Sequence, residues 1–207
     1  MLDCSCDSTV LDTIPLDCIK EFLKDGKWIF QKLDDANNKF VDGVNGIDLA
    51  ASWDPLPDAL DDTKVAITPV LEEVDIAEPG LLEDSENLDG APIQVDSEPT
   101  VFSAVFRLPT PAQYAALKNI GCEKALTVYR VDNNGKFAAR EVNSGEYAGF
   151  KISPGTFNLS EPFKSGNTRT DQLKLRVRFV LAVGYYELFR VISPASGFDP
   201  LNDIIPS

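Results

Sequence analysis

The 207-residue chain contains no histidine, so it lacks the commonest general base and a common metal ligand. Its cysteines are Cys4, Cys6, Cys18 and Cys122. Only the first two are close in sequence, and their C-x-C spacing is not the C-x₂-C pair typical of structural zinc sites. We therefore expect free thiols in a reducing compartment rather than zinc ligands.

The common catalytic motifs are also missing. The sequence has no glycine-rich phosphate loop and no G-x-S-x-G, and without histidine it cannot build a Ser-His-Asp site. Asp132-Asn133-Asn134-Gly135 begins like a calcium loop but lacks the spaced acidic ligands, and Asn143 stands at the twelfth position in place of the closing Glu. A carboxylate pair of the glycosidase kind stays open, because acidic residues are abundant. The expectation is a non-enzymatic protein without a cofactor or metal.

Charge is distributed unevenly along the chain. Residues 1–100 carry 24 acidic and 6 basic side chains, whereas residues 101–207 carry 9 acidic and 13 basic ones. This asymmetry suggests two surfaces of opposite potential, which favours head-to-tail self-assembly, although an acidic half that only keeps the protein soluble is the simpler alternative. The net charge of −14 disfavours nonspecific DNA binding, but it suits a surface past which DNA slides without sticking.

A row of cations lies on the most regular stretch of the sequence, Gln172–Val183. Apolar residues alternate with Lys174, Arg176 and Arg178, which predicts a half-buried strand about 40 Å long with a cationic outer face. We expect these three cations to contact neighbouring copies, although a phosphate site or a solvated face are alternatives. The candidate acidic partners are Glu72, Glu73, Glu83, Asp84 and Glu86.

The elements around this strand are predicted from local signals. Thr110, Pro111 and Gln113 form a capping box that opens a helix, which Gly121 ends at about residues 110–121. Two strands, 125–131 and 136–142, flank an Asn-Gly turn and predict a hairpin. Residues 185–192 are expected to run back beside the long strand as a long β-hairpin, unless Gly184 is a bulge within one longer strand. Trp53 is expected to fill the core.

The predicted fold is a mainly β sandwich or barrel with one short helix, a long hairpin and extended N- and C-terminal arms. Residues 1–100 are expected to form an acidic arm, short strands and a long acidic loop; residues 101–193 form the β core, and residues 194–207 an arm of the same structural unit. Segment 72–98 has ten acidic side chains and no basic one, so we expect a loop held by a neighbouring copy, or a loop packed on its own domain.

The sequence shows neither a membrane-spanning stretch nor the pattern of a secretory signal. No apolar stretch reaches the roughly 18 residues that a membrane-spanning helix needs. The first residues, MLDCSCDSTVLD, are acidic and lack the basic and apolar regions of a secretory signal. We therefore expect synthesis in the cytoplasm and no membrane span.

The chain combines a strand from Phe102, the Thr-Pro-Ala-x-x-Ala-x-Leu helix opening within 108–117, and the run LTVYRVDNNGK at 126–136. In these features, residues 102–135 resemble virion structural proteins of tailed phages that infect Bacteroidetes. The stretches Ala51-Ser52-Trp53, Asp62–Val65 and Thr68-Pro69 fit the same impression. Among virion proteins, the tail-tube type is the best match. It implies a β-sandwich or barrel with one helix, a long hairpin and two arms, stacked as rings with an acidic lumen.

The resemblance implies a subunit that binds copies of itself and other virion proteins in a virion assembled in the host cytoplasm, with DNA passing nearby. A capsid decoration protein and a head-to-tail connector are alternatives, because the region before Val101 is long and the turn at Gly184 is not defined by the sequence. A cellular β-sandwich binding domain or hydrolase is a further alternative. Electron microscopy would distinguish these three classes, because it would show a tube, a shell or a free monomer.

Overall fold

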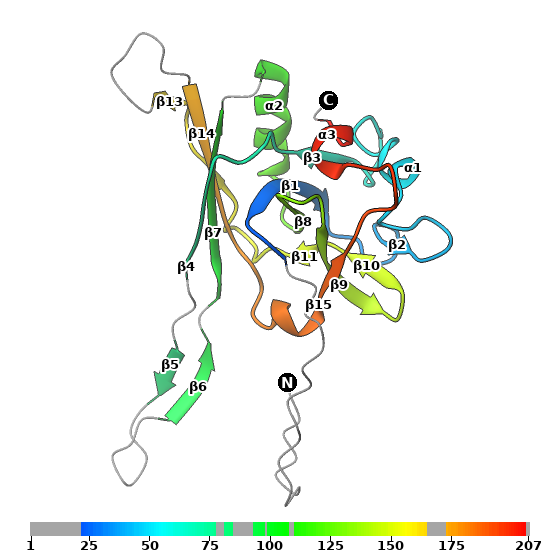
Figure 1. Ribbon diagram of the computed structural model, residues 1–207. Helices are drawn as coiled ribbons and strands as arrows, with labels where there is room; N and C mark the ends of the chain where they lie inside the picture. Colours follow the sequence, from blue (N-terminus) through cyan, green and yellow to red (C-terminus); the bar gives the residue numbers. More distant parts are fainter. Residues whose placement is uncertain are drawn as a thin grey trace, which may run out of the picture.

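The computed structural model describes residues 22–77, 81–84, 93–97, 99–107, 110–164 and 173–205. The protein is mainly β, and its curled antiparallel sheets form a half-barrel, which confirms the predicted fold class (Figure 1). Sheet A contains β1 (Asp25–Lys32), β2 (Phe40–Val41), β3 (Val65–Ile67), β8 (Leu126–Asp132), β9 (Phe137–Asn143), β10 (Glu146–Ala148), β11 (Phe150–Lys151) and β15 (Phe189–Ile192). Sheet B contains β4 (Glu73–Ala77), β7 (Val101–Arg107), β12 (Asn158–Leu159), β13 (Phe163–Lys164) and β14 (Leu173–Val180).

The main core lies between the two sheets. Trp28 and Phe30 of β1 are fully buried and meet Phe179 of β14, with ring centroids 4.8 and 5.6 Å apart. Helix α2 (Pro111–Ile120) adds Leu117 to this core, with Tyr114 and Ile120 partly buried beside it. The predicted helix is therefore confirmed.

A second core covers the opposite face of sheet A. Trp53, at the end of α1 (Ala50–Trp53), stacks on Phe137 of β9 with centroids 5.2 Å apart, and its indole N–H donates to the Ile47 carbonyl at 2.8 Å. Ile29 and Tyr129 enter this core from β1 and β8. Because both faces of the sheet are covered, β8 is buried along its whole length. Trp53 fills the core, as predicted.

Strand β14 shows the predicted alternation, since Leu175, Val177 and Phe179 are fully buried and Arg176 and Arg178 are exposed. It is shorter than predicted and pairs with β7 over seven residues. The predicted return of residues 185–192 beside it is wrong. Gly184 has φ 78°, the chain turns through the 3₁₀ helix η1 (Tyr185–Leu188), and β15 then pairs with β9 in sheet A.

The long hairpin lies instead in the acidic segment that was predicted to be a loop. Strand β4 pairs with β7, and beyond them β5 (Leu81–Asp84) pairs with β6 (Ile93–Ser97). Figure 1 shows β5 and β6 past the ends of β4 and β7, away from the packed sheets. The loop prediction failed because it used composition, whereas β7 supplies a long partner strand that orders the acidic β4.

The C-terminal segment is not the extended arm that was predicted. It carries α3 (Pro200–Asp203) and packs on the second core through Phe198 and Ile204. The predicted β8–β9 hairpin is confirmed, with Gly135 at φ 77° in its turn. Asp17 as a cap and the apolar Ile19, Phe22 and Leu23 on one face predict a short helix over residues 18–24. Most of this segment lies outside the described residues, and residues 22–24 are not helical. The sequence predicts one helical turn within the loop-rich stretch 42–62, and α1 is such a turn, whereas the short helix α3 was not predicted.

Candidate assembly surface

The outward side chains of β4, β7 and β14 form a surface that we call the charged face. The strand register aligns them in rows across sheet B: Lys174 opposite Arg107, then Arg176, Val105 and Glu73, then Arg178, Ser103 and Asp75. Side chains point to alternate sides of a strand, and the intervening residues, such as Phe102 and Phe106, are buried in the main core. The charged face therefore carries an acidic edge on β4 and a basic column on β14.

The two cations of the first row form ion pairs with acidic side chains of the same chain. The carboxylate of Glu72 accepts from Arg107 at 2.5 Å and lies 3.0 Å from Lys174 Nζ, which also reaches Glu73 at 3.2 Å. Hydrogen bonds from Lys174 and then Arg107 lower the pKa of Glu72, and those to Glu72 and Glu73 raise the pKa of Lys174. These groups are partly exposed, so each pair contributes little to stability.

Within the other two rows, no ion pair of the described residues joins β14 to β4. The two strands are two strand spacings apart, about 10 Å, a distance that Lys174 spans diagonally to Glu73 but that Arg176 and Arg178 do not bridge. Val105 and Ser103, which carry no charge, occupy the intervening positions. The guanidinium of Arg176 lies 5.8 Å from the ring of Phe163, and the described part of the chain offers no ion pair to Arg178 or Asp75.

The structure divides the predicted site residues into three groups. Lys174 meets Glu72 and Glu73 in the same chain, whereas Arg176 and Arg178 stay exposed on the charged face. The side chains of Glu83 and Asp84 on β5 are not described, and Glu86 lies outside the described residues. Sequence reasoning missed Arg107 and Asp75, although the alternation in VFSAVFR and EVDIA carries the signal for both.

Sheet B ends in an uncovered strand. Strand β4 is the last in the order β12-β14-β7-β4, and within the described residues no strand pairs with its outer side. Among the described strands, the two-residue strands β12 and β13 cover the opposite side of β14. An uncovered strand edge presents backbone N–H and C=O groups on which another strand can be added.

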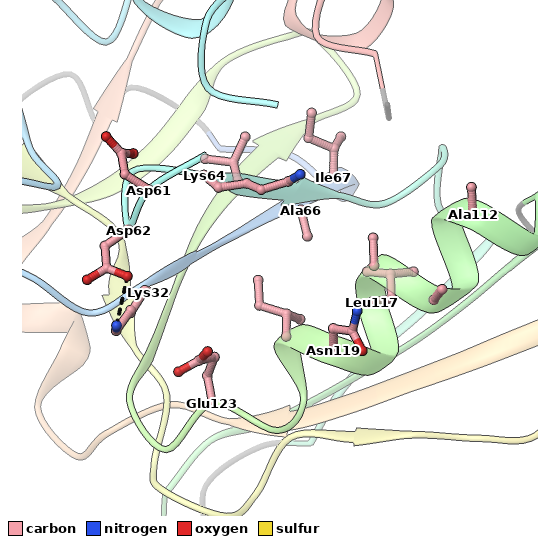
Figure 2. A pocket seen from close by; sticks show the side chains of 14 residues that line it. Lys32, Asp61, Asp62, Lys64, Ala66, Ile67, Ala112, Leu117, Asn119 and Glu123 are labelled. Atoms are coloured by element: carbon pink, nitrogen blue, oxygen red, sulfur yellow. Dashed lines mark hydrogen bonds and ion pairs between the residues drawn. The ribbon is translucent and has the colours of Figure 1, made fainter. Parts of the chain in front are cut away.

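A groove of about 460 Å³ lies between β3 and α2 (Figure 2). Its walls are mainly small and aliphatic, with Ala66 on the strand side and Leu117 on the helix side. At one end Lys32 pairs with Asp62 at 2.8 Å. Asp61 accepts hydrogen bonds from Thr63, which lowers its pKa, so this carboxylate is poorly suited to act as a general acid.

The described residues show neither a metal-binding cluster nor a membrane-spanning helix. No group of three or more Cys, Asp or Glu side chains there is arranged to hold a metal ion. Cys122 is an exposed free thiol, and the other cysteines lie outside the described residues. None of the described helices combines the length and the apolar character required to cross a bilayer.

The comparison with models of known protein families found no match, and neither did the search of curated proteins. Function is therefore inferred from the charged face, from the open edge of sheet B and from the resemblance of residues 102–135. Among these features, the open edge is the one that constrains a partner most directly, because a strand edge pairs with another strand.

Proposed function

We propose that this protein is a non-enzymatic structural subunit of a phage virion, of the tail-tube type, which assembles into stacked rings around a DNA channel. The observation that carries this proposal is the open edge of sheet B. The acidic strand β4 ends the sheet, and the hairpin of β4 to β7 continues beyond the packed body. A sheet with a free edge is completed when identical copies close a ring.

The charged face supports the same proposal. Arg176 and Arg178 form a basic column two strands away from the acidic Glu73 and Asp75. Two such surfaces attract each other when the acidic edge of one copy meets the basic column of the next. The net charge of −14 also suits a channel wall that repels the phosphates of passing DNA.

Electron microscopy of the purified native particle tests the proposal. Rings or tubes are expected. Decoration of a capsid shell would favour the capsid alternative, and particles that remain single at high concentration would reject self-assembly.

Arg176→Glu tests the basic column directly. The reversal places a carboxylate opposite the acidic edge of the neighbouring copy, so polymer yield should fall at least about tenfold while the monomer keeps its circular dichroism spectrum. Arg176 is exposed, so folding should not suffer.

Lys64→Glu is the matched control, because Lys64 lies at the β3–α2 groove and not on the charged face. It makes the same change of net charge and should leave polymer yield unchanged. Normal yield from Arg176→Glu, or an equal loss from both variants, would reject the assigned interface.

A further inference from the structure

The C-terminal segment 195–205, which we call the strap, crosses the second core without joining a sheet. Phe198 and Ile204 insert into this core and are 8% and 3% exposed. The ring of Phe198 meets Phe137 with centroids 6.0 Å apart. No described strand pairs with the strap, so side chains and scattered hydrogen bonds hold it in place.

Lys27 of β1 is the main polar attachment of the strap. Its ammonium donates to the carbonyls of Leu201 at 2.6 Å and of Ile204 at 2.7 Å, at the end of α3. The N–H of Ala195 donates to the carbonyl of Asp48 at 2.9 Å. These are local attachments rather than a ladder of paired strands, which is typical of a segment that opens independently.

The strap also has its own internal structure. The Asp199 side chain accepts from the Leu201 N–H at 3.0 Å and from the Asn202 amide at 2.6 Å, and Asp203 accepts from the Asp199 N–H at 2.7 Å. Pro194 precedes the strap, and Gly197 has φ 88°. A short segment with a preformed turn, joined to the last strand by a short connection, is suited to exchange between identical chains.

We propose that the strap detaches as a unit while both sheets stay folded, and that the vacated site accepts the strap of a second copy. The site is complete without the strap, because Lys27, Phe137 and Trp53 belong to β1, β9 and α1. This inference goes beyond the ring interface, which uses sheet B, and it does not depend on it.

Binding of a fluorescein-labelled peptide of residues 194–205 to the full-length protein tests the exchange. Apparent affinity is reduced by the fraction of sites that the chain's own strap occupies. The full-length variant Phe198→Ala/Ile204→Ala weakens its own strap but keeps the site, so it should bind the peptide at least about tenfold more tightly than the natural protein. Leu60→Ala, a change at a fully exposed side chain, should have no effect.

Two further measurements decide the outcome. A peptide that carries both alanine changes should bind neither protein. Hydrogen exchange of the unmodified protein should be at least about tenfold faster at the amide of Ala195, whose bond to the Asp48 carbonyl breaks when the strap detaches, than along β8 and β14. Equal exchange rates, or equal peptide binding by the variant and the natural protein, would overturn the proposal.

Discussion

Burial on β1 changes the ionisation of Lys27. Desolvation lowers its pKa from 10.5 to about 8, although the nearby carboxylates of Asp199 and Asp203 act in the opposite direction. Loss of the proton still leaves an amine with two N–H donors for the two carbonyls of the strap. The attachment is therefore expected to survive deprotonation.

This shift predicts that stability rises with pH above about 8. Between the folded pKa and the unfolded pKa of 10.5, the unfolded chain holds a proton that the folded chain has lost, so raising the pH favours folding. The free energy of unfolding should increase by about 2 kcal/mol between pH 7 and pH 9.5, because each pKa unit corresponds to about 1.4 kcal/mol.

Urea denaturation at the two pH values measures this increase. Lys27→Met should lose it, because methionine does not titrate, whereas Lys64→Met should keep it. An increase that persists in Lys27→Met would assign the pH dependence to other groups.

At the scale of elements, the turn between β8 and β9 was predicted from an Asn-Gly pair and is formed as expected. Gly135 has φ 77°, a conformation that side chains with a Cβ rarely adopt. An added Cβ would also lie 3.3 Å from Pro200 on the strap. The hairpin turn and the C-terminal segment therefore constrain each other, although 64 residues separate them in sequence.

Gly135→Ala should lower the free energy of unfolding by about 1–2 kcal/mol, because it forces an L-residue into the left-handed region. Gly135→Asn should cost less, since asparagine tolerates this conformation better. Urea denaturation of both variants at pH 7 measures the difference. Equal losses would indicate that crowding against Pro200, and not the backbone conformation, limits this position.

The acidic hairpin shows how an element depends on its partner. Residues 72–98 have the composition of a disordered segment, yet β4 is ordered because its backbone pairs with β7 and Val74 packs against the main core. Lys174 and Arg107 also neutralise Glu72 at the start of this strand. Neither contact is visible in the local sequence, because Arg107 of β7 lies 35 positions from Glu72 and Lys174 of β14 lies 101 positions from Glu73.

At the scale of the whole molecule, assembly through opposite charges should weaken with salt. Added ions screen attraction between exposed charges, with a Debye length of about 10 Å at 0.1 M and about 3 Å at 1 M. The protein concentration required for polymer formation should therefore rise at least about tenfold between 0.05 and 0.5 M NaCl, as measured by sedimentation. Polymers that become more stable with salt would indicate an apolar interface instead.

Local sequence patterns were enough to predict the half-buried alternation of β14, the α2 helix, the β8–β9 turn and the burial of Trp53. These features depend on side-chain alternation, capping and turn conformation, which act over a few residues. Arg176 and Arg178 were found as exposed cations for the same reason.

The pairing of distant segments became clear from the three-dimensional fold alone. In the fold, β15 pairs with β9 and not with β14, the strap packs on the second core of the same chain, and Lys174 forms an ion pair with Glu72 of the same chain. The local sequence of a strand does not specify which other strand will pair with it. The pairing depends on burying both faces of sheet A at once. That condition involves residues from Trp28 to Ile204, so no local pattern contains it.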